Sequence, residues 1–270
     1  MGGKIFMLER KSNPVKKKLQ DGKVVFGSCI YSFSPNIMEI AGYCGLDFCR
    51  IDNEHAWRQD QILEHLMRAA EISDILPLPR VDKDNPYLIR KVLEIGAGGF
   101  IIPDIKDEQE VRAIVRAAKF PPLGERGYSP LCFSGNYAIS NPSQWVKWSN
   151  EQTLVGVMIE TPQAMENLNK IMAVKGLDFV LFGPGDYSIR IGLDEPNKNH
   201  PKVKDAIQRT VSAAKKNDKY VMIGVGYPWE EEAQKYIKMG CQMIELGHDY
   251  TILSTMWRKM LGKIKVDNFC

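Results

Sequence analysis

The sequence has no apolar run that approaches the length of a membrane-spanning helix, so it is not expected to cross a membrane. It also lacks a strong charge of either sign. Its 270 residues carry a net charge of only +3, which is too small to indicate a nucleic-acid partner. The amino-terminal residues lack the apolar segment and small-residue cleavage site of a signal peptide, which favours a cytoplasmic location.

The cysteines form no CxxC pair and have no histidine at zinc-finger spacing, which argues against a structural zinc site. Several of them lie inside apolar runs such as "GYCGLDFCRI", so we expect reduced thiols in the core of a cytoplasmic protein. The six residues are Cys29, Cys44, Cys49, Cys132, Cys241 and Cys270.

Three nucleotide and hydrolase signatures are also missing. No GxGxxG follows the first predicted strand, and the chain has neither a Walker A loop nor a GxSxG elbow. Apolar residues make up 44% of the chain and charged residues 26%, which is ordinary for a globular protein with a substantial core. The basic residues of the amino-terminal segment (Lys4, Arg10, Lys11, Lys16, Lys17 and Lys18) are interpreted as a solvated helical face rather than a polyanion site.

Short apolar runs alternate with longer amphipathic stretches along the whole chain. The runs are nearly continuous in apolar residues, as in parallel strands that are covered on both faces. They are "VVFGSCI" from Val24, "LDFCRID" from Leu46, "LPLPRV" from Leu76, "GGFIIPDI" from Gly98, "LVGVMIE" from Leu154, "DFVLFGP" from Asp178, "YVMIGVG" from Tyr220 and "CQMIELG" from Cys241. Eight strand-then-helix units in this length predict a single-domain (β/α)8 TIM barrel, with an open doubly wound sheet as the main alternative.

Helical periodicity is clearest over residues 60–72, 107–120, 164–176 and 230–240. Asp107 is expected to cap one of these helices, and Gly96, Gly176 and Gly240 are expected to end helices. Residues 121–145 are the least regular part and are expected to form a long functional or mobile loop after the fourth strand. We expect one domain over residues 1–270, with a basic segment at residues 1–20 and the last helix at residues 249–270.

Active sites of such barrels gather at the carboxyl ends of the strands. Glu160 and Asp186 end adjacent predicted strands, which lie about 4.8 Å apart, so the two carboxylates could share one hard cation such as Mg²⁺ or Mn²⁺. The alternative is that Glu160 caps the next helix and Asp186 ends a turn. None of the eight strand ends carries a lysine, so Schiff-base catalysis is not expected.

Two other strand ends carry groups suited to catalysis. Arg80 is shaped to hold a carboxylate bidentately, although a salt bridge to a nearby acidic strand end is the alternative. His55 follows Asp52 and Glu54, and a neighbouring carboxylate suits an imidazole to general acid–base work. His248 ends the last strand and is left as an open candidate.

Several segments, taken together and in order, resemble the HpcH/HpaI-type class II aldolases of the phosphoenolpyruvate/pyruvate barrel superfamily. They are "IDNEHAW", "LPRV", "VLEIGAGGFIIPDI", "FPPLGERG", "MIET" and "GLDFVLFGPGDYS". The similarity spans Gly27 to Gly247. These families cleave 4-hydroxy-2-oxo acids, of the 2-keto-3-deoxy acid or 4-hydroxy-2-oxoheptanedioate type, into pyruvate and an aldehyde.

The resemblance implies a role for each matched residue. Glu160 and Asp186 would hold a divalent cation, Mg²⁺ or Mn²⁺ first and Co²⁺ or Zn²⁺ as alternatives. Arg80 would contact the keto oxygen of pyruvate, and the Gly183–Gly185–Asp186 turn would hold its carboxylate. His55, supported by Asp52, would move the proton of the 4-hydroxyl through water. The cation would stabilise the pyruvate enolate. The resemblance also implies a homo-oligomer, a hexamer in which the last helix is exchanged between subunits.

The chain departs from the family pattern at four places. Met158 stands where the family often has a glutamine. Tyr187 stands where a leucine is usual, and this tyrosine could narrow the pocket or add a hydroxyl to it. Glu94 stands where an aspartate of a neighbouring subunit often supports the catalytic histidine, and Glu54 is a further supporting candidate. The segment after "ERG" also differs, so the aldehyde is left open. Oxaloacetate decarboxylation or another enolate reaction on the same site, and a non-catalytic carboxylate-binding barrel, remain as alternatives.

Overall fold

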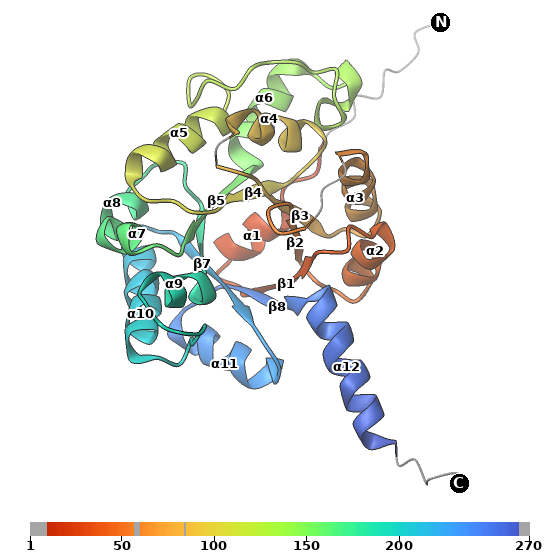
Figure 1. The fold of residues 1–270 in the computed structure, drawn as a ribbon. Coiled ribbons are helices and arrows are strands. Elements are labelled where there is room, and N and C mark those ends of the chain that lie inside the picture. Colours follow the sequence, from red (N-terminus) through yellow and green to blue (C-terminus); the bar gives the residue numbers. More distant parts are fainter. Residues whose placement is uncertain (1–9, 57–59, 84, 265–270) are drawn as a thin grey trace, which may run out of the picture.

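The computed structural model describes residues 10–56, 60–83 and 85–264. Eight parallel strands form a closed barrel in which neighbours in sequence pair with each other and β1 pairs with β8 (Figure 1). The strands are β1 (Val25–Ile30), β2 (Phe48–Asp52), β3 (Leu76–Arg80), β4 (Gly99–Ile102), β5 (Leu154–Ile159), β6 (Phe179–Phe182), β7 (Tyr220–Val225) and β8 (Met243–His248). The predicted TIM barrel is confirmed, and every predicted run overlaps one of these strands.

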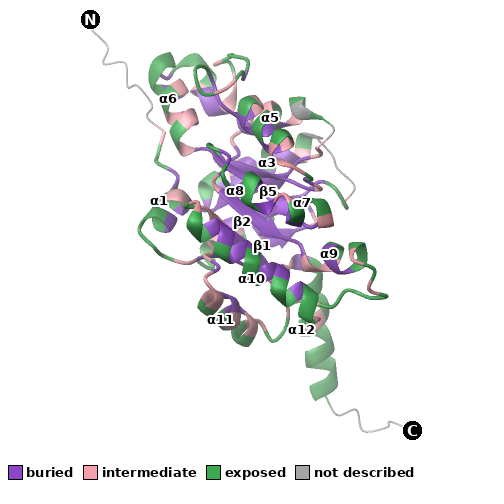
Figure 2. Cartoon of the chain, turned by 90° about the vertical axis from the view of Figure 1, so that its left-hand side faces the viewer, coloured by how far each residue is buried: buried purple, intermediate pink, exposed green. Residues whose placement is uncertain are grey.

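Helices cover the outside of the barrel (Figures 1 and 2). They are α1 (Pro14–Gln20), α2 (Pro35–Tyr43), α3 (Asp60–Ile72), α4 (Pro86–Glu94), α5 (Glu108–Ala118), α6 (Pro142–Gln152), α7 (Pro162–Glu166), α8 (Leu168–Met172), α9 (Pro184–Arg190), α10 (Pro201–Lys216), α11 (Trp229–Met239) and α12 (Asp249–Lys263), with a 3-10 helix η1 (Phe133–Ala138). Asp107 caps α5 and Gly240 ends α11 with a φ of 106°, both as predicted.

The helix predicted over residues 164–176 is instead two short helices, α7 and α8, that meet at Asn167. The Asn167 amide donates to the main-chain oxygens of Lys106 and Gln163, at 3.1 and 3.2 Å. A side chain that hydrogen-bonds the backbone in this way competes with the continuation of a helix. Gly176 therefore ends no helix, because α8 already stops at Met172.

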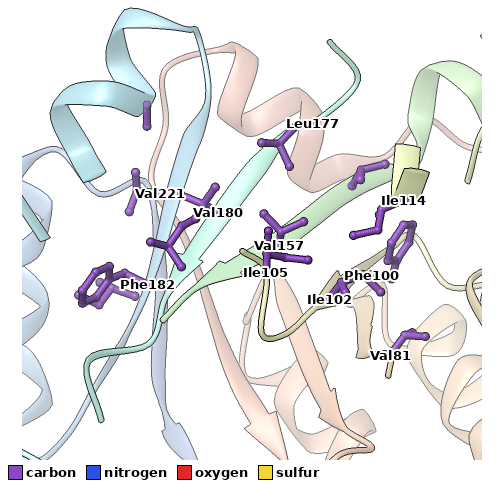
Figure 3. Close-up of a cluster of buried hydrophobic side chains, with 14 of the residues drawn as sticks. Val81, Phe100, Ile102, Ile105, Ile114, Val157, Leu177, Val180, Phe182 and Val221 are labelled. Atoms are coloured by element: carbon purple, nitrogen blue, oxygen red, sulfur yellow. The ribbon is translucent and has the colours of Figure 1, made fainter. Parts of the chain in front are cut away.

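The core has two layers, one inside the barrel and one between the barrel and its helices. Inside, Gly156 leaves room for the ring of Phe179, because a Cβ at Gly156 would lie 2.2 Å from a ring carbon of Phe179. Outside, strand residues such as Val157 and Val180 face helix residues such as Ile114 (Figure 3). Figure 2 shows the buried strands at the centre with exposed helix surfaces around them. This packing fixes the strands, and with them the positions of the side chains at their ends.

The amino-terminal segment packs against the barrel. Val15 and Leu19 of α1 are buried in the same cluster as the barrel interior. Lys16 forms a 3.0 Å ion pair with Asp178 and is half-buried. Arg10 stacks on Phe133 and is also half-buried. The interpretation as a solvated face is therefore wrong for Arg10 and Lys16, while Lys11, Lys17 and Lys18 are exposed; Lys4 lies outside the described residues.

The irregular segment at residues 121–145 does not follow the fourth strand directly, because α5 intervenes. The segment leads into β5 and therefore lies at the amino ends of the strands, where Phe133 packs against Gly96. A cavity of about 420 Å³ there is lined by Leu76, Gly98 and Phe133. Within one chain, this segment is thus on the opposite side of the barrel from the carboxyl ends, contrary to the expectation that it influences the aldehyde partner.

The cysteines are only partly in the core. Cys29, Cys49 and Cys241 are buried free thiols, whereas Cys44 is exposed and Cys132 is half-buried, so the core prediction is wrong for these two. Cys270 lies outside the described residues. Among the described helices, none combines the length and the apolar character that crossing a bilayer requires.

Helix α12 projects away from the barrel (Figure 1). It begins at Asp249 and carries a series of exposed apolar side chains along its length. These are Leu253, Met256, Trp257, Met260 and Leu261. Since a solvated helix rarely presents so much apolar surface, α12 is a candidate surface for association.

Candidate active site

The residues predicted to carry the chemistry meet at the carboxyl ends of the strands. Asp52 and Arg80 are the last residues of β2 and β3 and pair directly in register. Glu160 follows β5, and Gly183 follows β6. They reach one edge because all eight strands are parallel. A cavity of about 450 Å³ opens among these strand ends.

Asp52 lies at the centre of a buried charge network. Its Oδ2 accepts hydrogen bonds from Nη2 of Arg80 and, at 2.9 Å, from Nη1 of Arg50. Burial would raise the pKa of Asp52, but the hydrogen bond and charge of Arg80, together with Arg50, outweigh it and lower the pKa below its ordinary value. Asp52 is therefore a fixed anion that holds both guanidinium groups in place.

Arg50 of β2 links Asp52 to Glu245 of β8. Its guanidinium grips Glu245 of β8 bidentately, with Nε to Oε2 at 2.7 Å and Nη2 to Oε1 at 2.9 Å. The sequence analysis missed both residues. The signal was available, since "FCRI" and "MIELG" each place one charged residue inside an otherwise apolar run. A charge at such a position must face a partner within the barrel.

Arg80 forms salt bridges with nearby acidic residues, as the alternative prediction stated, and its side chain also lines the cavity. Its Nη1 lies 2.9 Å from Oε2 of Glu54. Its buried Nε has no hydrogen-bond partner within the described residues. Because that Nε is covered by protein atoms, a ligand would contact the part of the side chain that lines the cavity instead.

His55 is exposed and lines the cavity. The expected support from Asp52 reaches it through the backbone: the main-chain N–H of His55 donates to Oδ1 of Asp52 at 2.9 Å, and that of Glu54 does so at 3.2 Å. Asp52 thus fixes the loop that carries the imidazole. No hydrogen bond joins the imidazole to Asp52 within the described residues, which differs from a direct carboxylate–imidazole pair.

The two proposed metal ligands differ in exposure. Glu160 is buried at 3% exposure, and its Oε1 accepts the main-chain N–H of Asp104 at 2.8 Å. Asp186 is exposed in the first turn of α9. Burial raises the pKa of Glu160 to about 7, and the nearby charge of Asp186 acts in the same direction.

The donor set fits a hard divalent cation. Neither Glu160 nor Asp186 forms a salt bridge within the described residues, and oxygen is the ligand atom that Mg²⁺ and Mn²⁺ prefer. The backbone at Gly183 leaves room for this carboxylate, because a Cβ there would lie only 2.8 Å from Oε2 of Glu160. Gly185 and Asp186 belong to the first turn of α9, where main-chain N–H groups have no helical partner.

Two residues expected near the site lie elsewhere in this chain. Tyr187 is buried at 8% exposure and packs against Phe182, with ring centroids 5.5 Å apart, so it neither narrows the cavity nor adds a hydroxyl to it. Glu94 ends α4 and lines a different cavity together with Cys132. Its contribution to a neighbouring subunit's site stays a prediction. Met158 lines the cavity, and its Sδ lies 3.8 Å from Nη1 of Arg80.

His248, the open candidate, also lines the cavity. Its Nε2 lies 3.7 Å from Oε1 of Glu245, and its ring packs edge-on against Tyr31 with centroids 5.3 Å apart. Burial lowers the pKa of His248 below its ordinary value, although Glu245 acts in the opposite direction. The sequence analysis did not single out Tyr31, which directly follows β1.

The fold and these groups define a class of protein, a TIM-barrel enzyme with an acidic pair and buried arginines at its catalytic face. The sequence profile of the family described as HpcH/HpaI aldolase/citrate lyase matches residues 26–255. The chain belongs to this family, as the sequence analysis predicted. Family membership also decides for an enzyme over a non-catalytic barrel, and the chain is a lyase of the aldolase type.

Individual relatives agree with this assignment. The 2-keto-3-deoxy-L-rhamnonate aldolase of Escherichia coli (strain K12) is 30% identical over 263 residues, which cover 94% of each chain. An HpcH/HpaI aldolase from Desulfitobacterium hafniense DCB-2 superposes with a TM-score of 0.89 at 30% identity, covering 94% of this chain and 98% of that one. The citrate synthase SbnG superposes with a TM-score of 0.83 at 29% identity, covering 92% and 95%.

Proposed function

We propose that this aldolase reversibly cleaves a 4-hydroxy-2-oxo acid into pyruvate and an aldehyde with the help of a divalent cation held by Glu160 and Asp186. The observation that carries the proposal is the environment of Glu160. Its carboxylate is buried against Gly183, near a second carboxylate and without a salt-bridge partner in the described residues. A divalent cation would compensate both charges, with Mg²⁺ or Mn²⁺ the first candidates.

A cation bound there supplies Lewis-acid stabilisation of the charge that develops on the keto oxygen. The chain's own groups do the rest. Arg80, held by Asp52 and Glu54 beside the cavity, would donate to the same oxygen. The free N–H groups of Gly185 and Asp186 bind the substrate carboxylate.

The remaining step is the transfer of the proton of the 4-hydroxyl. His55 lines the same cavity on a loop that Asp52 fixes by two main-chain hydrogen bonds. An imidazole there can take up that proton, directly or through a water molecule, as the C3–C4 bond breaks. In the synthetic direction the same group returns the proton to the new hydroxyl.

The test measures pyruvate release from a panel of 4-hydroxy-2-oxo acids and exchange of pyruvate methyl protons with deuterium, with Mg²⁺, Mn²⁺ or Co²⁺ added. We expect both activities, and we expect their loss on chelation and in Glu160→Gln. The matched control is Glu166→Gln, which removes an exposed carboxylate on α7. Absence of release and of exchange with every metal would refute the proposal, and full activity of Glu160→Gln would remove that residue from the site.

A second candidate has one observation in its favour. The likeness to the citrate synthase SbnG covers nearly the whole chain, and that enzyme's name describes carbon–carbon bond formation. The same acidic pair and Arg80 would serve oxaloacetate decarboxylation or addition of an enolate to another acceptor. Product analysis with oxaloacetate, alone and with pyruvate, distinguishes these reactions. Decarboxylation that is faster than every aldol cleavage would favour this candidate.

We also propose that the enzyme is a homo-oligomer associated through α12. The exposed apolar side chains of this projecting helix support association with another copy, and the resemblance favours a hexamer. Light scattering of the purified protein measures the assembly mass. Trp257→Lys should shift it toward the monomer, and a monomeric parent protein would overturn the proposal. The free buried thiols support a reducing compartment such as the cytoplasm.

A further inference from the structure

Asp104 lies in the loop after β4 with its backbone in an unusual conformation. Its φ is 54°, in the left-handed region that side chains rarely adopt, although aspartate and asparagine tolerate it better than most. Such a conformation persists only where the surrounding structure holds it, and it is often found beside functional groups. In this conformation the main-chain N–H of Asp104 donates to Oε1 of Glu160 at 2.8 Å. The strained residue therefore contacts one of the two proposed metal ligands directly.

Two cations hold Asp104 in this conformation. Nη1 of Arg190 pairs with Oδ1 of Asp104. Nζ of Lys83 donates to the main-chain oxygen of Asp104 at 2.9 Å and lies 3.5 Å from its Oδ2. Lys83 is itself fixed by Glu110 of α5, whose Oε1 lies 3.1 Å from Nζ. Every polar group of Asp104 is thus engaged, which accounts for the persistence of its left-handed backbone.

Arg190 belongs to α9, the helix that carries the second proposed ligand. Asp186 is in the first turn of this helix, and Arg190 follows four residues later on the same face. The buried side chains of α9 anchor its inner side, whereas Asp186 and Arg190 are exposed. The ion pair between Arg190 and Asp104 attaches this exposed face to the loop after β4.

Asp104 thus connects the two elements that carry the acidic pair. Groups that orient metal ligands contribute about 10–100-fold to metal affinity. We propose that Asp104 is a positioning residue, which fixes the spacing of Glu160 and Asp186 for a divalent cation. Lys83 and Arg190 hold it in that role. This inference rests on the proposed function. The described residues that line the active-site cavity include none of these three, so they act through the ligands and not on the substrate.

Electrostatics alone makes the opposite prediction for Arg190. The hydrogen bond to Asp104 raises the pKa of Arg190, and the charges of Glu160 and Asp186 act in the same direction. This cation is therefore within electrostatic reach of both proposed ligands. If charge alone mattered, its removal would strengthen the binding of a metal ion. If its contact with Asp104 holds α9 in place, its removal should weaken that binding.

The experiment measures Mn²⁺ affinity by calorimetric titration of chelator-treated protein without pyruvate, with thermal unfolding as the check on folding. Arg190→Met removes the charge and keeps an unbranched side chain. Asp104→Asn keeps the main-chain N–H and tolerates the left-handed backbone, so it removes only the carboxylate charge. We expect each variant to lose about 10–100-fold in Mn²⁺ affinity. The double variant should bind no worse than the weaker single variant, because both changes break one contact.

Two more variants test the contacts around Asp104. Arg190→Lys keeps a point charge that can reach one carboxylate oxygen, so it should bind Mn²⁺ within about threefold of the parent. Lys83→Met frees the main-chain oxygen of Asp104 and should lose affinity. The matched control is Arg68→Met, because Arg68 pairs with Glu64 on α3 and its side chain is 43% exposed, close to the 38% of Arg190. The control should bind Mn²⁺ like the parent.

The possible failures are distinguishable. If the parent binds no Mn²⁺, or binds it equally well after Glu160→Gln, the proposed cation site fails and this inference fails with it. If Glu160→Gln abolishes binding by a parent that does bind, then equal or tighter binding by folded Arg190→Met overturns the inference alone. Losses in Arg190→Met and Asp104→Asn that add up in the double variant have the same consequence, because independent effects would then explain them.

Discussion

Replacing Gly183 with alanine perturbs the acidic pair without changing any charge. The new Cβ would lie 2.8 Å from Oε2 of Glu160 and 3.0 Å from its Cβ, whereas ordinary contacts begin at about 3.4 Å. The backbone at Gly183 has φ −96° and ψ 87°, so alanine fits there without left-handed strain. The fold should therefore persist while the carboxylate retreats by roughly 0.6 Å, the difference between these two contact distances.

A retreat of that size matters for a metal ligand. Coordination distances in protein sites vary by only about 0.2 Å, and Mg²⁺ in particular demands near-ideal geometry. Changes to the groups that orient metal ligands typically cost about 10–100-fold in affinity. That range corresponds to about 1.4–2.7 kcal/mol of binding free energy. We expect Gly183→Ala to lose Mn²⁺ affinity within it.

The assay is calorimetric titration of Mn²⁺ into chelator-treated protein without pyruvate, with thermal unfolding as the check on folding. Gly185→Ala is the matched control, because a Cβ at Gly185 meets nothing within 4 Å. The control should bind Mn²⁺ like the parent protein. If Gly183→Ala also binds within threefold of the parent and remains folded, then Glu160 is not a ligand, and the reasoning from this contact is wrong.

Three further predictions concern stability. Arg50→Met should destabilise the protein by about 3–5 kcal/mol in urea unfolding, because it leaves Glu245 buried without its counter-charge; adding Glu245→Leu should recover most of the loss, and a single-variant cost below about 1 kcal/mol would contradict this. Burial lowers the pKa of Lys119 to about 8 from 10.5, so the unfolded chain binds more protons between these values and stability should rise with pH there. Lys119→Met should abolish that rise, which is at most about 3.4 kcal/mol. Equal slopes in both proteins would refute the assignment. Asp107→Ala removes the cap that accepts two main-chain N–H groups of α5 and should cost about 1 kcal/mol in the same assay; no loss would show that water replaces the cap.

The barrel could be predicted because each strand is apolar on both faces and each is followed by an amphipathic stretch. That pattern is local, and it fixes which residues end the strands. Residues 121–145 were placed after the fourth strand, although the helix predicted over residues 107–120 lies between them and sends the segment to the amino ends. The break at Asn167, in contrast, depends on a hydrogen bond to Lys106, a residue that is distant in sequence.

The candidate site could be predicted only where a charged residue directly follows the apolar run of a strand. Asp52, Arg80 and Glu160 were found in this way. Arg50 and Glu245 were not found, because each lies inside a strand rather than at its end. They become partners only when barrel closure brings β2 and β8 to either side of β1. The same holds for Tyr31, which is distant from His248 in sequence but packs against it at the edge of the cavity.

The arrangement of charge around the cavity explains why a cation would bind at β5 and β6 rather than elsewhere. At β2, β3 and β8, the anions Asp52 and Glu245 are held by Arg50 and Arg80, so they have little remaining attraction for a metal ion. Glu160 and Asp186 have no such salt bridge within the described residues, and their mutual repulsion contributes to the raised pKa of Glu160. The buried arginines thus perform two tasks with one set of contacts. They neutralise Asp52 and Glu245, and they leave Glu160 and Asp186, the proposed metal ligands, without a salt-bridge counter-charge within the described residues.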